Sequence, residues 1–216
     1  MTRKRRTIHI CTGGNLDVLP VVQENDTIFG VDGGAIRLLD QGIVPNMAIG
    51  DFDTIGEEGI LRLQQAGVQM EQYPSHKDLT DTEIAIEVAV ALEPDEIILY
   101  GALGSRMDHT LANLQLLQKA QLAGVWMQIE SKQNRVFLLS EQFPQFTISR
   151  DHFRFMSLLP MSEKVTGITL EGFMYPLHEA TIEMGMAIGV SNEFLHETGT
   201  IALKQGKLFV MLTNDN

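Results

Sequence analysis

The stretch of residues 81–129, DTEIAIEVAVALEPDEIILYGALGSRMDHTLANLQLLQKAQLAGVWMQI, decides the fold of this chain. Helical patterns cover Asp81–Leu92 and Asp108–Ala123, and each is followed by a short apolar run, Ile97–Tyr100 and Trp126–Ile129. Apolar runs of this length, bounded by Gly or acidic residues, are typical of buried strands. The alternation of helix and strand therefore predicts a parallel sheet covered by helices.

The first of these helices begins with a capping box, Thr80-Asp81-Thr82-Glu83. In this motif the side chains of the first and fourth residues accept hydrogen bonds from backbone N–H groups that the helix leaves free. The motif therefore predicts a helix that begins close to Asp81.

Four further apolar runs lie upstream, and each is bounded by Gly, Pro or acidic residues. These predicted strands are Ile8–Cys11, Thr27–Val31, Met47–Ile49 and Val68–Met70. Together with the stretch quoted above, they predict an α/β N-terminal domain with a mostly parallel sheet over residues 1–133.

The pattern changes from about Arg135 onward, where short strand-like runs follow one another without a long helical period between them. The runs are Arg135–Leu139, Phe155–Leu159, Val165–Leu170, Ala180–Ile182, Ala187–Val190, Thr200–Leu203 and Leu208–Leu212. Turn signals such as Glu171-Gly172 and Gln205-Gly206 separate them. This spacing predicts an all-β antiparallel sandwich domain over residues 134–216.

Composition narrows the class of protein. The chain has 216 residues, 44% of them apolar and 20% charged, which is typical of a globular protein and excludes a disordered tail or a coiled coil. The net charge of −12 argues against nucleic-acid binding, because such proteins need a basic face. No run approaches the ~18 apolar residues of a membrane-spanning helix. The single cysteine, Cys11, cannot form an internal disulfide, so we expect a reducing, cytoplasmic location.

Aspartates follow several of the predicted strands. Asp32 ends the second strand, and Asp51 and Asp53 end the third, where two residues apart in an extended chain they point to the same side. Asp81 and Asp108 lie at helix starts after the fourth and fifth strands. Because ligands bind beyond the carboxyl ends of parallel strands, we expect these carboxylates to gather at one rim of the sheet.

Clustered carboxylates repel one another unless a cation lies among them. Oxygen ligands suit Mg²⁺, which binds a few carboxylates together with substrate phosphates. The glycine pairs Gly13-Gly14 and Gly33-Gly34 would let backbone N–H groups approach phosphate oxygens. Each Asp taken alone is more often a turn former or a helix cap, and each glycine pair a turn. Their convergence on one rim favours a magnesium–phosphate site.

Four blocks of sequence resemble thiamine pyrophosphokinases, in the order that this family has them. The blocks are Asp32-Gly33-Gly34-Ala35, Gly50-Asp51-Phe52-Asp53-Thr54, the segment Lys77–Glu83 and the segment Gly101–His109. Farther on, Ser157-Leu158-Leu159-Pro160 and Ser191-Asn192 are similar to the thiamine-binding half of the family. The small departures are Thr54, Ser105 and Asn46, where the family commonly has Ser, Gly and Asp. The resemblance covers nearly the whole chain.

The resemblance implies a nucleotide-binding N-terminal domain, a thiamine-binding sandwich, and a homodimer with thiamine held where two subunits meet. It implies a set of site residues for each ligand. Mg²⁺ would be held by Asp32, Asp51, Asp53 and Asp81, of which Asp51, Asp53 and Asp81 would be catalytic. ATP would be bound by Gly13, Gly14, Asn15, Gly33, Gly34, Lys77, Thr80, Gly101, Gly104 and Arg106, and thiamine by Asp108, Ser191 and Asn192.

The expected function is that of a transferase, which moves the diphosphate group of ATP to the hydroxyl of thiamine and releases AMP. Two alternatives stay open from the residues alone: an Mg²⁺-dependent nucleotide phosphohydrolase, and a non-catalytic nucleotide sensor. The motif Gly-x-x-x-x-Gly-Lys-Ser/Thr is absent from the sequence, which excludes a P-loop kinase.

Overall fold

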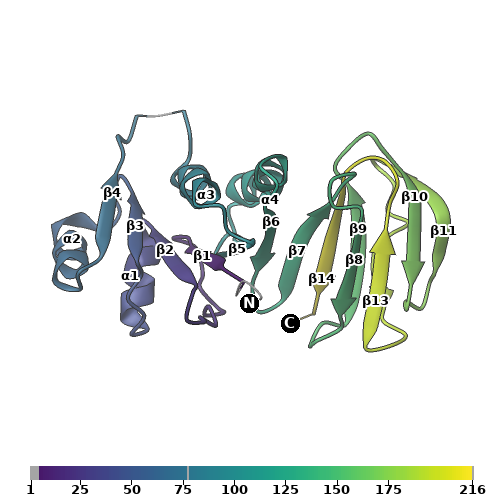
Figure 1. The fold of residues 1–216 in the computed structure, drawn as a ribbon, viewed down its shortest axis with the longest axis horizontal. Helices are drawn as coiled ribbons and strands as arrows, with labels where there is room; N and C mark the ends of the chain where they lie inside the picture. The colour runs from purple at the N-terminus through teal and green to yellow at the C-terminus, as the bar shows by residue number, and fades with distance from the viewer. Residues whose placement is uncertain (1–4, 77, 216) are drawn as a thin grey trace. The chain divides into compact units, whose positions relative to one another are not determined.

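The computed structural model describes residues 5–76 and 78–215 of the chain. The chain divides into two compact units, Met1–Lys132 and Gln133–Asn216, which are described separately below (Figure 1). Within the described residues, none of the helices has the length and hydropathy needed to cross a bilayer.

The first unit alternates strands and helices. Its elements are β1 (Thr7–Cys11), β2 (Thr27–Val31), α1 (Gly33–Asp40), β3 (Met47–Gly50), α2 (Gly56–Gln65), β4 (Gln69–Gln72), α3 (Asp81–Ala91), β5 (Glu96–Tyr100), α4 (Met107–Leu122) and β6 (Trp126–Glu130). The strands lie in the order β6-β5-β1-β2-β3-β4, and every pair is parallel. The predicted parallel sheet with helices is therefore confirmed, and the strand bounds differ from prediction by at most two residues.

Apolar side chains of α1 and α2 fasten these helices to the sheet. Ala35 and Leu63, each 0% exposed, form one buried cluster with Ala48 and Phe52. Leu38, on the same helix as Ala35, packs in a second cluster with Cys11, Ile28 and Tyr100. Burial raises the pKa of the Cys11 thiol to about 12, so this group stays protonated and acts as a small apolar residue.

The start of α3 forms half of the predicted capping box. The backbone N–H of Glu83 donates to Thr80 Oγ1 at 3.2 Å, and α3 begins at Asp81 as predicted. The reciprocal half is wrong, because the Glu83 carboxylate accepts a hydrogen bond from Lys119 Nζ at 2.7 Å instead. Lys119 also contacts Glu87, so these carboxylates tie α3 to α4.

The second unit contains strands in two antiparallel sheets. The strands are β7 (Asn134–Leu139), β8 (Gln145–Ser149), β9 (Phe155–Pro160), β10 (Lys164–Glu171), β11 (Leu177–Glu183), β12 (Asn192–Glu193), β13 (Thr198–Ala202) and β14 (Leu208–Thr213). One sheet has the order β12-β9-β14-β7 and the other β11-β10-β13-β8. The rings of Phe137 on β7 and Phe146 on β8 lie 5.1 Å apart, so the two sheets share an apolar core. The predicted antiparallel sandwich is confirmed.

The sequence analysis of this unit missed one strand and predicted another that does not form. Strand β8 was not predicted, because its sequence alternates exposed polar residues with Phe146 and Ile148 and so has no apolar run. The strand predicted at Ala187–Val190 is wrong: Ile188 is 73% exposed and Val190 46% exposed, in a turn between β11 and β12. A short apolar run is not always a buried strand, because apolar side chains can also lie at the protein surface. The side chains of Ile188 and Val190 do so here.

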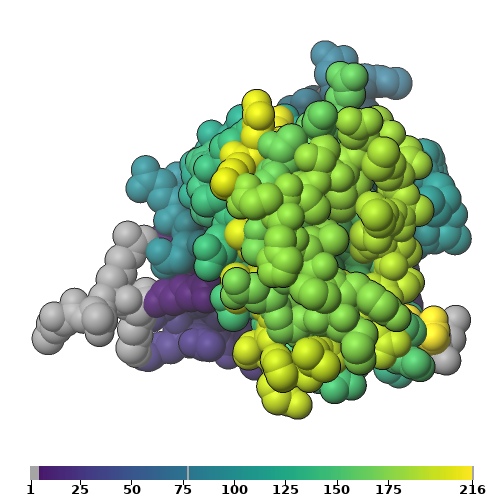
Figure 2. Space-filling view, turned by 90° about the vertical axis from the view of Figure 1, so that its right-hand side faces the viewer, coloured from purple at the N-terminus to yellow at the C-terminus, as the bar shows by residue number. Residues whose placement is uncertain are grey.

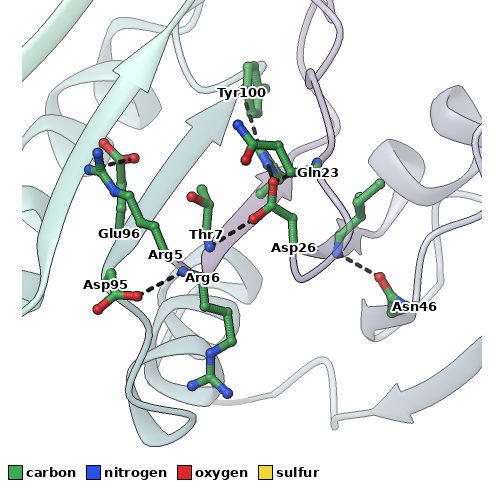
Figure 3. Close-up of polar contacts among 11 residues, drawn as sticks. Arg5, Arg6, Thr7, Gln23, Asp26, Asn46, Asp95, Glu96 and Tyr100 are labelled. Carbon is green, nitrogen blue, oxygen red and sulfur yellow. Dashed lines mark hydrogen bonds and ion pairs between the residues drawn. The ribbon is translucent and has the colours of Figure 1, made fainter. Parts of the chain in front are cut away.

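A buried polar network holds the loop before β2 against β1 (Figure 3). His9, 2% exposed, lies with Nε2 3.3 Å from Asp26 Oδ2 and Nδ1 3.2 Å from Tyr100 Oη. Because an ionised carboxylate only accepts, Nε2 carries the proton and Nδ1 accepts from the tyrosine hydroxyl. Asp26 also accepts from the N–H groups of Thr7 at 3.0 Å and Gln23 at 2.8 Å. These contacts hold the orientation of the ring, and they suit a neutral imidazole with its proton on Nε2.

This network predicts a specific loss of stability in mild acid. Burial lowers the pKa of His9 below its ordinary value of 6.5, against the opposing effect of Asp26. Below about pH 6.5 the unfolded chain thus gains a proton that the folded chain does not, and the free energy of unfolding falls as the pH falls. Burial raises the pKa of Asp26, but its hydrogen bonds with Gln23, Thr7 and His9 lower it overall, so that carboxylate adds a loss only below about pH 4.

The variant His9→Gln tests this effect. We expect its unfolding free energy to change less between pH 7 and pH 5 than that of the wild type, by up to ~1.4 kcal/mol per pH unit. The variant is less stable at pH 7, so the readout is the slope from urea unfolding at several pH values. The other histidines are common to both proteins and cancel. Identical slopes would show that folding does not shift the pKa of His9, which would contradict this account.

Candidate active site

A cleft of about 690 Å³ lies at the carboxyl ends of the strands in the first unit. Its walls come from the loops after β1, β2 and β5 and from the starts of α3 and α4. Ten of the predicted site residues line it: Gly13, Gly14, Asn15, Asp32, Gly33, Thr80, Asp81, Gly101, Gly104 and Arg106. Segments that are up to 93 positions apart in the sequence therefore meet at the rim where parallel sheets bind ligands.

The other predicted residues are not among those that line this cleft. Asp51, Asp53, Gly34 and Asp108 do not line this cleft. Lys77 falls outside the described residues. Ser191 and Asn192 belong to the second unit.

Within each glycine pair, the two members have different surroundings. A Cβ on Gly34 would lie 2.1 Å from the Cys11 carbonyl oxygen, and one on Gly14 would lie 2.0 Å from the Gly101 carbonyl oxygen. Both residues are therefore glycine because backbone meets backbone there. A Cβ on Gly13 or on Gly33 would have its nearest neighbour at 3.9 Å, so the backbone of both residues is open to the cleft.

Asp32 connects the ends of β2 and β3. It precedes the first residue of α1 with φ 45°, and its Oδ1 accepts from the backbone N–H of Phe52 at 3.3 Å. A Cβ on Gly50 would lie 1.8 Å from the same oxygen, so the end of β3 must be glycine for the carboxylate to fit. The carboxylate of Asp32 is thus held between two strand ends at the cleft floor.

Asp51 and Asp53 lie on a turn, which corrects the expectation of an extended chain. Phe52 between them has φ 62° and is 2% exposed, since its ring is part of the core beneath α1 and α2. The backbone N–H of Asp53 donates to Asp51 Oδ1 at 3.1 Å. The buried phenylalanine therefore anchors a tight turn, and this turn brings the two aspartates together.

Neighbouring carboxylates raise the pKa values of both Asp32 and Asp53. Burial raises the pKa of Asp32 to about 7, and repulsion by Asp81 and Asp51 acts in the same direction. The pKa of Asp53 is raised by its interactions with Asp51 and by repulsion from Asp81. Carboxylates from three separate segments thus repel one another at one rim, which is the arrangement that a bound cation would stabilise.

The donor set fits Mg²⁺ in its chemistry without forming a closed cage. Among the described residues, no three Asp, Glu, His or Cys side chains are grouped closely enough to hold a metal ion. Mg²⁺ is commonly bound through one or two carboxylates, with substrate phosphates and water completing its shell. Pairs such as Asp32 with Asp81 meet that requirement, so the site is compatible with an ion that arrives with a nucleotide.

Arg106 and Asp108 form a bidentate pair at the mouth of the cleft. Nη2 of Arg106 lies 2.6 Å from Asp108 Oδ2, and Nε lies 3.3 Å from Oδ1. The guanidinium lowers the pKa of Asp108 to about 2. Of these two residues, Arg106 lines the cleft and Asp108 does not. The Asp108 carboxylate therefore orients the Arg106 guanidinium at the edge of the cleft.

In the second unit, Asn192 and Ser191 differ in their availability. Asn192 is 6% exposed, and its amide is used by the backbone of Tyr175: Oδ1 accepts from the N–H at 3.1 Å and Nδ2 donates to the C=O at 2.8 Å. Ser191 is exposed, has φ 60°, and donates its backbone N–H to Ser157 Oγ at 3.0 Å. Asn192 thus fixes the local loop, and Ser191 is an exposed residue beside it.

Sequence reasoning missed several residues of the cleft. Thr12 donates its hydroxyl to the Gly101 carbonyl at 2.6 Å, and Asn113 donates to the Ala102 carbonyl at 2.8 Å. Both hold the loop after β5 in place. Arg37 also lines the cleft, one helical turn beyond Gly33. That spacing was a signal in the sequence, because residues four apart on a helix share a face.

Both halves of the chain match models of one family. Residues 19–129 match "Thiamin pyrophosphokinase, catalytic domain", and residues 145–208 match "Thiamin pyrophosphokinase, vitamin B1 binding domain". A thiamine pyrophosphokinase of Bacillus subtilis (strain 168) is 36% identical over 217 residues, covering 97% of this chain and 100% of the relative.

Solved structures agree with this match. The crystal structure of thiamine pyrophosphokinase from B. subtilis superposes with a TM-score of 0.89 at 35% identity, covering 97% of this chain and 100% of that one. The protein from Geobacillus thermodenitrificans gives a TM-score of 0.86 at 35% identity, with 97% and 98% covered. With the four ordered blocks and the acidic cleft already described, these matches lead to one conclusion. The chain belongs to the thiamine pyrophosphokinase family.

Proposed function

We propose that this protein transfers the diphosphate group of ATP to the hydroxyl of thiamine, giving thiamine diphosphate and AMP. The observation that carries the proposal is the meeting of Asp32, Asp51, Asp53 and Asp81 beside an open glycine backbone. Such a site suits phosphoryl chemistry, in which the protein mainly positions the reactants and neutralises charge. Membership of the family supplies the acceptor, thiamine.

In the proposed reaction the thiamine hydroxyl attacks the β-phosphorus of ATP. The bond from that phosphorus to the oxygen shared with the α-phosphate breaks, the electron pair leaves with AMP, and the hydroxyl proton is released to solvent. Asp32, Asp51, Asp53 and Asp81 would hold Mg²⁺, one or two of them directly and the others through water, and the ion when bound would neutralise the phosphate chain. Gly13 and Gly33 offer backbone N–H groups to phosphate oxygens, and Arg106 offers its guanidinium. We propose the same role for Lys77 from its place in the sequence.

Exposed apolar side chains on the second unit support a homodimer. Figure 2 views this unit from the side of β10 and β11. Within segment 174–195 the large apolar residues that are exposed are Met174 at 51%, Tyr175 at 66%, Met184 at 60%, Met186 at 47%, Ile188 at 73%, Val190 at 46% and Leu195 at 55%. Apolar surface of this extent marks an interaction site. We propose that a second copy covers it and that Ser191 contributes to thiamine binding from there.

The proposed function is tested by following the nucleotide. The protein is incubated with ATP and Mg²⁺, with and without thiamine, and the products are separated. AMP that forms only with thiamine, in equal amount with thiamine diphosphate, is the expected result. Nucleotide products that form equally without thiamine would indicate a phosphohydrolase. Unchanged ATP in both samples would indicate a sensor, and either outcome contradicts the proposal.

Ser191→Ala is expected to raise KM for thiamine by roughly 2- to 13-fold, the effect of losing one neutral hydrogen bond of ~0.5–1.5 kcal/mol. KM for ATP should stay within about twofold, because this hydroxyl lies in the thiamine-binding unit. Steady-state kinetics with each substrate varied in turn measures both values. Ser149→Ala, at an exposed position of β8, is the matched control. An unchanged KM for thiamine would remove Ser191 from the site.

Mixing subunits tests whether two chains share each thiamine site. Ser191→Ala subunits are combined with Asp51→Asn subunits, and subunit exchange is verified. If sites are shared, one of the two sites in each mixed dimer carries neither substitution, and activity with wild-type KM for thiamine returns. If each site belongs to one subunit, every site keeps a defect. Verified exchange without recovery would exclude the shared site.

A further inference from the structure

Arg37, on α1, is held over the glycine loop that follows β1. Its Nε donates to the Gly13 carbonyl oxygen at 3.3 Å. Arg37 lines the main cleft and also an adjoining pocket of about 420 Å³ between α1 and α2. The side chain therefore stands where the two cavities meet.

Among the described residues, Arg37 has no carboxylate partner. Two other arginines that line these two cavities each have one. Arg62, across the adjoining pocket, is paired with Asp40 at 2.6 Å, and Arg106, at the other edge of the cleft, is paired with Asp108 at 2.6 Å. A guanidinium that lines a cleft and has no carboxylate partner among the residues that the structure describes is available to bind an anion.

We infer that Arg37 binds the phosphate chain of the donor nucleotide, an inference that rests on the proposed function and names a new contact for it. The Gly13 carbonyl uses only Nε, which leaves both terminal nitrogens of the guanidinium free to donate. A guanidinium fork matches two oxygens of one phosphate. The open backbone of Gly13 and Gly33 lies beside it, so one phosphate could meet N–H groups and the guanidinium together.

Substitution of Arg37 tests the contact. Arg37→Gln keeps a donor for the Gly13 carbonyl but removes the charge, and Arg37→Ala removes both. Each is expected to weaken ATP binding roughly 10- to 100-fold, the effect of losing a hydrogen bond to a charged group. The dissociation constant is measured by calorimetry with Mg²⁺ and without thiamine, so the result does not depend on turnover. Arg62→Ala is the matched control, because Arg62 lines the adjoining pocket and not the main cleft. The affinity of this variant for ATP should equal that of the wild type.

Two competitors separate the phosphate chain from the nucleoside. Tripolyphosphate and adenosine are each titrated against bound ATP in wild type and in Arg37→Gln. The inference predicts that the variant binds tripolyphosphate roughly 10-fold or more weakly and adenosine within about twofold of wild type. Weaker binding of adenosine alone would assign Arg37 to the nucleoside, and unchanged binding of both would remove it from the site. Either result overturns the inference.

The same measurements distinguish this inference from the proposed function. If the wild type forms thiamine diphosphate but Arg37→Gln binds ATP normally, only the Arg37 contact is wrong. If the wild type forms AMP without thiamine while Arg37→Gln loses affinity for tripolyphosphate, the contact stands and the acceptor assignment fails.

Discussion

Replacing either Asp51 or Asp53 by Asn is expected to lower kcat by at least about 100-fold, the scale of losing an electrostatic contact to transferring phosphoryl groups. Both side chains sit on a turn whose anchor is Phe52, and the turn's hydrogen bond to Asp51 Oδ1 can be retained by an amide oxygen. The substitutions therefore remove charge without removing a packing contact. Steady-state kinetics measures the loss, and circular dichroism shows whether the fold is intact.

Asp215→Asn provides the control for a lost negative charge, because Asp215 is exposed in the second unit. It should retain wild-type turnover. If Asp51→Asn or Asp53→Asn is also near wild type at ordinary Mg²⁺ concentration, that residue does not take part in the reaction. A variant that fails to fold would show that the turn needs the negative charge. That result would contradict the expectation that these aspartates serve the reaction and not the packing of the turn.

Asp32→Asn is expected to abolish turnover and yet to make the protein more stable at pH 8 in the absence of divalent ions. Burial and repulsion by Asp81 and Asp51 raise the pKa of Asp32 to about 7. The folded chain thus holds a proton between about pH 4 and pH 7 that the unfolded chain has lost, so the unfolding free energy falls as the pH rises through that window. An amide at this position never becomes charged. Asn also tolerates the positive φ, and its oxygen can accept from Phe52.

Thermal unfolding with and without Mg²⁺ measures how the Asp32 carboxylate affects stability in each condition. Without the ion, the melting temperature of Asp32→Asn should exceed that of wild type at pH 8 and approach it at pH 5. Adding Mg²⁺ should raise the wild-type value more than that of the variant. A variant that melts below wild type at pH 8 without Mg²⁺ would mean that the carboxylate acts chiefly as a helix cap for α1.

The fold was predictable from sequence wherever burial coincided with an apolar run. Thr80 and the periodic residues after it located α3, and Thr27–Val31 was predicted with its observed bounds. Prediction failed in the second unit, where Gln145–Ser149 is a strand of alternating residues and Ala187–Val190 is apolar but exposed. We propose that the apolar side chains of Ala187–Val190 pack against a second copy of the chain.

The site was predictable from the order of its blocks but not from local geometry. Asp51 and Asp53 were placed together for the wrong reason, because no pattern revealed the positive φ of Phe52. Which glycines are open depended on contacts across the fold, since Gly14 meets Gly101 only after β1 and β5 have paired. Arg37 could have been found from its place four residues after Gly33, but its lack of an ion-pair partner among the described residues is visible only in three dimensions.

The central claim is that two phosphates move together from ATP to thiamine. It is tested most directly with ATP that carries radioactive phosphorus at either the α or the γ position, incubated with the protein, Mg²⁺ and thiamine. Attack at the β-phosphorus predicts the α label in AMP and the γ label in thiamine diphosphate, in equal amounts. Labelled ADP together with thiamine monophosphate, or the γ label in free phosphate, would contradict it.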